Sequence, residues 1–218
     1  MQYQLQDVPL NNQTYNLTFN FIFAKDILDK KILVKGSSLK EKNAYNNFLN
    51  EIVDVLYKVS NLKELGLEKD VLNDLPEQSL IELHNILSGK IGDLVPEKEN
   101  EKSGIISSFD IKFNLVESEN LKEIIIKNST TLSARKMKVY RPKLQSVFNE
   151  NPKEKDIKEY FETLAFIIKS ETGLSNQDIT ALDLQNKLPY LSLASLSGFL
   201  TQSDEINLEK KTGNITSN

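Results

Sequence analysis

The sequence contains no cysteine, one histidine and two arginines among its 218 residues. Without cysteine the chain can form no disulfide and offers no thiol nucleophile or thiolate metal ligand. A zinc site needs about four nitrogen or sulfur ligands, and one histidine cannot supply them. The eight glycines are dispersed, so neither a dinucleotide-binding G-x-G-x-x-G nor a P-loop is present. We therefore expect no metal, no cofactor and no small-molecule ligand.

Catalysis is also poorly supported by the residues that are present. The single histidine, His84, lies in "IELHNIL" beside Leu80, Leu83 and Leu87 at helical spacing, which favours a partly buried histidine over a catalytic base. The acids are scattered among lysines, as in "PKEKDIKEYFE", a pattern typical of solvated helix faces. We predict a protein that is not an enzyme. The alternative is a cytosolic bacterial enzyme, or an enzyme accessory subunit, that uses carboxylates.

The composition is that of a folded protein, with 39% hydrophobic and 27% charged residues. The segment "MQYQLQDVPL" has neither the basic nor the apolar part of a secretory signal. The longest apolar stretch, residues 188–203, is interrupted by polar residues and is shorter than the ~20 residues that span a bilayer. We therefore expect a soluble protein, without membrane insertion, that is made in the cytoplasm.

In the first half, apolar residues alternate from Tyr15 to Phe23, which predicts a strand. Ser38 and Glu41 fit a capping box, after which Tyr45, Phe48, Ile52, Leu56 and Val59 recur at helical spacing before Gly66. A second helix is predicted from Asp74 as N-cap, with Pro76 in its first turn, to Gly89. Gly89 and Gly92 resemble the G-x-x-G loop of KH domains, but the following Asp93 favours a helix C-cap and turn.

The charged segment 92–104 reads as a linker, and the pattern then repeats. Alternation from Phe109 to Leu115 and a second apolar run at 121–127 predict a hairpin, followed by a short strand at 137–140 before Pro142. A helix after Asn151 and Pro152, ending at Gly173, a short helix that opens at Ser175 with Asp178, and a last helix from Pro189 to about Leu200 complete the prediction. The fold class is α+β.

These elements divide into an N-terminal region at 1–97, a C-terminal region at 104–201 and a mobile polar tail at 202–218. Each region has strands first and helices afterwards. "LTFNFIF" at Leu17 and "IKFNLVE" at Ile111 are loosely alike, so the two halves could derive from an internal duplication.

The most distinctive feature is electrostatic. Between Glu123 and Glu150 there is no acid, whereas the rest of the chain has 31 acids against 21 bases. The window holds six positive charges, including both arginines of the chain: Lys127, Arg135, Lys136, Lys138, Arg141 and Lys143. Because arginine makes planar, bidentate contacts, this window indicates a surface that docks onto an acidic protein. Protection of an edge strand by lysines is a second interpretation.

Nucleic-acid binding is a third and weaker interpretation of the same window. No run of aromatic residues accompanies the bases apart from Tyr140, whereas single-stranded nucleic acids are bound by several stacking aromatics. The acidic remainder of the chain would also repel a polyanion. We therefore take other protein subunits as the partners. The candidate interface residues are Arg135, Lys136, Lys138, Arg141 and Lys143.

Two segments resemble a known class of proteins. "YFETLAFIIKSETGLSNQDITALDLQNKLPYLSLASLSGFL" (160–200) and "LNDLPEQSLIELHNIL" (72–87) are similar to helical parts of tail-assembly and baseplate-hub proteins of contractile-tailed bacteriophages. The segments cover about a quarter of the chain and consist of leucine patterns, without catalytic or metal-binding residues. The resemblance implies a structural protein of the virion, assembled in the host cytoplasm. The strand "TYNLTFNFIF" departs from the pattern of hub subunits.

Overall fold

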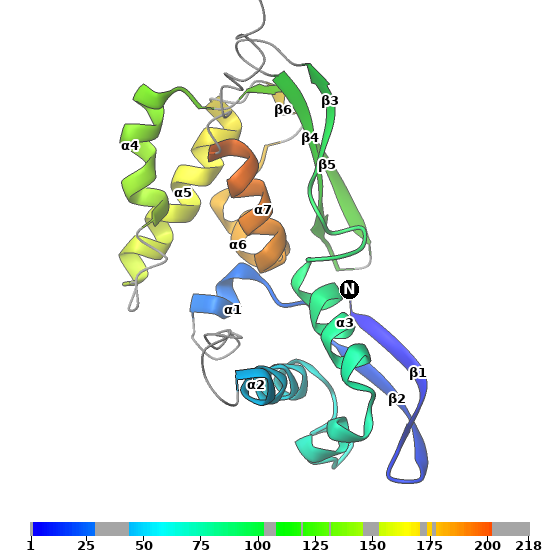
Figure 1. Cartoon of the computed structure of the whole chain (residues 1–218). Coiled ribbons are helices and arrows are strands. Elements are labelled where there is room, and N and C mark those ends of the chain that lie inside the picture. Colours follow the sequence, from blue (N-terminus) through cyan, green and yellow to red (C-terminus); the bar gives the residue numbers. More distant parts are fainter. Residues whose placement is uncertain are drawn as a thin grey trace, which may run out of the picture.

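The structure, a computed structural model, has the α+β fold that the sequence predicts, arranged as two lobes (Figure 1). It describes residues 2–28, 44–102, 108–118, 120–130, 132–145, 153–170, 174–175 and 178–201. Each lobe has its own hydrophobic cluster, one built mainly from residues before position 95 and the other mainly from residues after 108. The predicted capping box at Ser38 and Glu41 and the predicted tail at 202–218 lie outside the described residues.

The N-terminal lobe begins with a hairpin of β1 (Tyr3–Leu10) and β2 (Gln13–Phe19). Asn11 and Asn12 both have positive φ angles, of 50° and 62°, as a two-residue type I′ turn requires. The predicted strand at 15–23 is only partly right, because β2 ends at Phe19. The first strand, β1, was not predicted.

Two helices and a 3₁₀ turn pack on this hairpin: α2 (Ala44–Val59), η1 (Lys69–Asp74) and α3 (Glu77–Ser88). Ile52, Leu56 and Val59 of α2 are buried as predicted, but Tyr45 is 53% exposed. Asp74 belongs to η1 and is not the N-cap of α3, which is Pro76. Gly89 is the predicted C-cap, with a left-handed φ of 75°.

The C-terminal lobe contains an antiparallel sheet in the order β3-β4-β5-β6. Its strands are β3 (Glu97–Lys102), β4 (Ser108–Val116), β5 (Leu121–Thr130) and the two-residue β6 (Leu174–Ser175). Phe109, Ile111, Phe113 and Leu115 of β4 point to the same face and are buried against the helices. The hairpin predicted from this alternation is confirmed.

The segment predicted as a linker contains a strand. β3 pairs with β4 over Glu97–Lys102, although its sequence, "EKENEK", has no hydrophobic residue. It forms the edge of the sheet, where charged residues are well tolerated and prevent pairing with other chains. Lys98 faces the core side, and its Nζ lies 4.3 Å from the ring centroid of Phe109 and 5.2 Å from that of Phe199.

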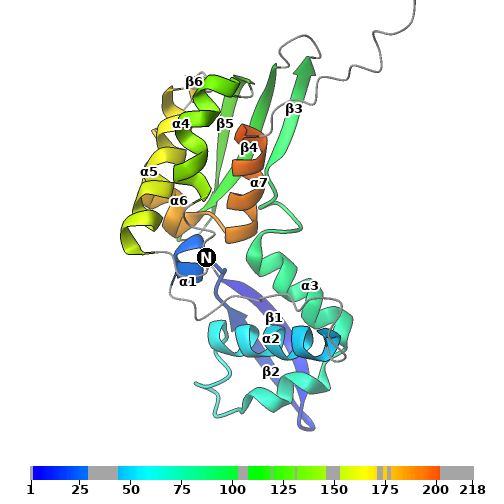
Figure 2. The same ribbon diagram turned by 60° about the vertical axis from the view of Figure 1, so that its left-hand side comes forward.

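Four helices lie on the same side of this sheet, with α4 packed on the outside of α5: α4 (Ala134–Gln145), α5 (Glu154–Ser170), α6 (Ala181–Lys187) and α7 (Tyr190–Thr201) (Figures 1 and 2). The strand predicted at 137–140 is wrong, because these residues are in α4. The short helix starts later than predicted, with Thr180 and Asp183 as its capping box, and Ser175 belongs to β6. The last helix begins directly after Pro189, as predicted.

The two lobes meet at a buried junction. The backbone N–H of Ile22 donates to the carbonyl of Leu87 (2.9 Å), and the N–H of Tyr190 donates to the carbonyl of Ile22 (3.1 Å). The hydroxyl of Ser192 donates to the carbonyl of Gly89 (3.1 Å). The short helix α1 (Ala24–Leu28) follows Ile22 and packs on α6 and α7. Segments from both ends of the sequence therefore hold the lobes together.

Candidate functional site: the basic surface of α4

Helix α4 forms because its apolar residues recur at helical spacing. Ser133 is its N-cap, with its hydroxyl accepting from the backbone N–H of Lys136 at 3.4 Å. Met137 and Leu144 are buried, and Tyr140 packs on the same hydrophobic cluster. These three residues face α5, so the remaining positions of the helix face solvent.

The five predicted interface residues all lie on this exposed part of α4. Arg135, Lys136, Lys138, Arg141 and Lys143 are each exposed. Lys143 pairs with Glu159 of α5 at 3.2 Å, whereas Arg135, Lys138 and Arg141 have no ion-pair partner among the described residues. Since these residues are on a helix, the interpretation of the window as a protected edge strand is wrong. The sixth cation, Lys127, lies on β5 and pairs with Asp110 at 3.0 Å.

The arrangement of charge on α4 is locally unfavourable. Its first turn contains Arg135 and Lys136 and no acid, although the N-terminal end of a helix dipole favours negative charge by about 0.3–1 kcal/mol. With five cations and no acid in twelve residues, neighbouring turns also repel each other. An acidic partner would remove both penalties.

The surface also has an apolar part that the sequence analysis missed. Val139 is 59% exposed between the cations, and Phe166 of α5 is 52% exposed. Phe166 lies beside Tyr140, with ring centroids 6.3 Å apart. Reading 134–145 as a helix would have placed Val139 one turn after Arg135 and one turn before Lys143. We call Arg135, Lys136, Lys138, Val139, Arg141, Lys143 and Phe166 the α4 surface.

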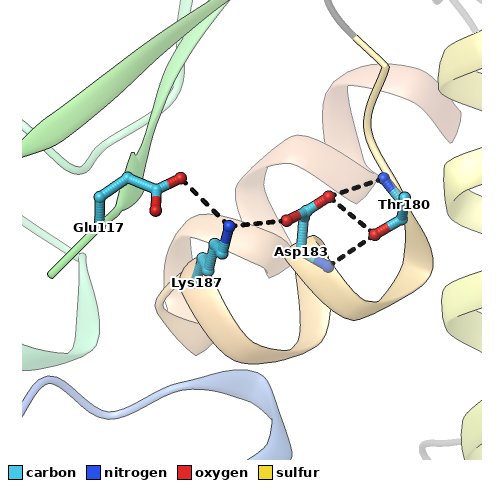
Figure 3. Close-up of polar contacts among 4 residues, drawn as sticks. All are labelled: Glu117, Thr180, Asp183 and Lys187. Carbon is cyan, nitrogen blue, oxygen red and sulfur yellow. Dashed lines mark hydrogen bonds and ion pairs between the residues drawn. The ribbon is translucent and has the colours of Figure 1, made fainter.

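A second polar cluster connects the sheet with α6 (Figure 3). Lys187 pairs with Asp183 at 2.9 Å and with Glu117, at the end of β4, at 3.1 Å. Asp183 completes the capping box with Thr180. Hydrogen bonds to Asp183 and Glu117 raise the pKa of Lys187. Burial opposes ionisation of Asp183, but its hydrogen bonds with Thr180 and Lys187 outweigh this and lower its pKa. Both groups are thus held in their charged forms, as in a structural ion pair rather than a general acid or base.

His84 is buried, and burial is the main cause that lowers its pKa to about 4. Its Nε2 has no hydrogen-bond partner within the described part of the chain. This fits the predicted buried histidine. Within the described ranges, the acids and His84 form no cluster that could hold a metal ion.

No family model, no curated protein and no solved structure matches this chain. Among the helices that the structure describes, none has both the length and the apolarity needed to cross a membrane.

Proposed function

We propose that this chain is a non-enzymatic assembly protein that binds an acidic protein surface through the α4 surface. One observation carries the proposal: five cations, including both arginines of the sequence, are exposed on a single helix that has no acid. Arg135, Lys138 and Arg141 are not neutralised by any described residue. Opposite charge on a partner would give the contact its specificity and speed its formation.

The apolar residues favour a protein over a nucleic acid as the partner. Val139 and Phe166 are both more than half exposed, and a protein interface would bury them in its centre behind a charged rim. In the described N-terminal lobe, residues 2–28 and 44–95, 11 acids stand against 5 lysines. This net negative charge would repel a polyanion.

The resemblance to contractile-tail proteins indicates which large complex the chain would enter. Its segments correspond to the end of η1 with most of α3, and to the C-terminal part of α5 with β6, α6 and most of α7. These elements contribute to the cores of the two lobes, and the exposed face of α4 is left for a partner. We therefore propose a tail or baseplate component that is incorporated into the virion.

The test is a double charge reversal, Arg135→Glu with Arg141→Glu. Glu at position 135 suits the N-terminal end of the helix dipole, and exposed charges contribute little to stability, so the variant should fold as the wild type does. It should nevertheless fail to enter the large complex, because like charges would face each other. Gel filtration of extracts from cells that assemble the complex, alongside circular dichroism of the purified chains, measures both properties.

Two further variants serve as controls. Lys102→Glu with Lys122→Glu makes the same change in net charge at exposed sites on β3 and β5 and should be incorporated normally. Arg135→Lys with Arg141→Lys keeps the charge but loses the bidentate contacts, so incorporation should be reduced but not lost. Normal incorporation of the Arg-to-Glu variant would contradict the proposal. Tight, salt-sensitive binding of the wild type to random DNA would favour a nucleic-acid-binding module instead.

The proposal that this chain is not an enzyme has a separate test. Turnover by the purified chain that disappears after a single carboxylate-to-amide substitution would favour the alternative of a carboxylate-using enzyme.

A further inference from the structure

The N-terminal lobe carries a surface that is opposite in charge to the α4 surface. From Asn61 to Glu82 the chain has six acids and two lysines. One of these lysines, Lys69, is neutralised by Asp54 at 2.7 Å. All six acids are exposed, and five of them lie around η1 and the start of α3: Glu64, Glu68, Asp70, Asp74 and Glu77. We call these five residues the acidic end.

The carboxylates of the acidic end are available to a partner. Glu64, Glu68, Asp74 and Glu77 make no ion pair with any residue that the structure describes. Leu65 lies among them and is 42% exposed. The acidic end thus combines carboxylates with an exposed apolar residue, just as the α4 surface combines cations with Val139 and Phe166.

The two surfaces lie at opposite ends of the molecule. In both views α4 is at the upper end, and η1 with the start of α3 is at the lower end (Figures 1 and 2). A single copy therefore cannot satisfy its own α4 surface, but it can offer each surface to a different copy.

We propose that the partner of the α4 surface is the acidic end of a second copy of this chain. The inference rests on the proposed function, which requires an acidic protein surface, and adds which surface that is. The contact joins two different surfaces, so a pair of bound copies still has one unoccupied α4 surface at one end and one unoccupied acidic end at the other. Copies therefore add head to tail, into a row or a closed ring.

Two charge-reversed variants test the contact. One is the Arg135→Glu, Arg141→Glu variant, and the other is Glu64→Lys with Glu68→Lys. The latter two residues make no side-chain hydrogen bond in the described structure and cap no helix through a side chain. Sedimentation velocity over a range of concentrations at low salt should show oligomers for the wild type. Each variant alone should be monomeric, with self-association weakened by at least about 100-fold, because like charges oppose each other at the contact.

An equimolar mixture of the two variants is the decisive sample. One variant keeps an intact acidic end and the other keeps an intact α4 surface, so the mixture should form heterodimers although neither component self-associates. Wild-type oligomers should dissociate as salt is raised. The matched controls are Lys102→Glu with Lys122→Glu for the cations and Asp93→Lys with Glu101→Lys for the acids, all at exposed positions. Both controls should assemble as the wild type does.

A wild type that stays monomeric at every concentration, or a mixture that stays monomeric, would overturn the inference. A different result would contradict the proposed function. If the wild type is monomeric but Arg135→Glu with Arg141→Glu still abolishes entry into the large complex, then the acidic partner is another protein and only the identity of the partner is wrong. If that variant enters the complex normally, both proposals are wrong.

Discussion

At the scale of single residues, two polar groups show how the fold treats charge in its interior. Lys98 places its Nζ over the rings of Phe109 and Phe199, so its positive charge is stabilised by aromatic faces while its stem covers the core. His84 has no such partner. Its Nε2 is buried without a hydrogen bond to any described residue, and its lowered pKa keeps it neutral near pH 7.

We predict that His84 makes the fold less stable in mild acid. In the unfolded chain it takes up a proton near its ordinary pKa of 6.5, but in the folded chain only near pH 4. Between these values the unfolded state binds more protons, so the free energy of unfolding falls as the pH is lowered from 6.5 to 4. The full loss is about 3 kcal/mol. Urea unfolding at a series of pH values measures it.

His84→Leu is the control for this prediction. It removes the group that titrates and a buried nitrogen without a partner, so stability at pH 7 should be unchanged or higher. Carboxylates titrate in the same range in both chains, and the difference between the two pH profiles therefore isolates His84. Parallel profiles would show that the lowered pKa has no effect on folding.

At the scale of elements, the sequence predicts well those helices and strands that bury a regular apolar pattern. The alternation of Phe109, Ile111 and Phe113 predicts β4, and the stripe of Ile52, Leu56 and Val59 predicts the buried face of α2. In both cases the periodic apolar residues share one face of the element and are buried there, and this is the condition under which periodicity is informative. The internal duplication suggested by the similar segments at Leu17 and Ile111 stays a prediction.

The missed strands lacked an uninterrupted pattern of this kind. β3 consists of charged and polar residues, and it forms because β4 offers a free edge with which its backbone can pair. In β1 the alternation is interrupted, because the register shifts between Leu5 and Val8, and the strand pairs with β2 across the turn at Asn11 and Asn12. The sequence does indicate that turn, since consecutive asparagines tolerate the positive φ angles of a type I′ turn.

The sequence predicted which residues make up the basic part of the candidate site, but it did not predict that they lie on a helix. The charge pattern alone identified all five cations of α4. The strand prediction treated Pro142 as the end of an element, whereas a proline is tolerated here in the last turn of the helix. The spacing of Met137, Tyr140 and Leu144 was the better signal, since it repeats every three to four residues. Phe166 could not have been predicted, because it joins the surface only through the packing of α5 on α4.

The buried face of α2 gives a stability prediction. Ile52 is completely buried, so Ile52→Ala should lower the free energy of unfolding by about 2–5 kcal/mol. Tyr45 lies on the same helix and is mostly exposed, so Tyr45→Ala should change it by no more than about 0.5 kcal/mol. Chemical denaturation of the two variants checks the assignment. Equal effects would mean that the faces of α2 are assigned wrongly, or that Tyr45 is buried by another chain.

At the scale of the whole molecule, the junction decides whether the two lobes act as one body. Separate hydrophobic clusters can unfold separately, but here Ile22 is hydrogen-bonded to Leu87 on one side and to Tyr190 on the other. Tyr190 also packs on both clusters. A rigid connection would keep the α4 surface and the acidic end at a fixed separation, as regular head-to-tail assembly requires.

Gly89 is the residue at which this connection can be tested. Its φ of 75° is left-handed, and an added Cβ would overlap with the hydroxyl of Ser192 and lie 2.8 Å from Cβ of Pro189. Gly66 has nearly the same φ, 72°, but an added Cβ would meet no atom within 4 Å. The two glycines therefore have the same backbone requirement and differ in whether the other lobe is close.

We predict that Gly66→Ala costs only the left-handed backbone penalty, about 1–2 kcal/mol. Gly89→Ala should cost the same amount plus about 1–3 kcal/mol, because Ser192 and Pro189 have to move. Since these residues begin α7, their displacement should also weaken the hydrogen bonds that join the lobes. Urea unfolding followed by circular dichroism and by tyrosine fluorescence should give coincident transitions for the wild type and for Gly66→Ala. The two probes should separate for Gly89→Ala, as one lobe unfolds before the other. Coincident curves with equal midpoints for both glycine variants would mean that the junction does not couple the lobes.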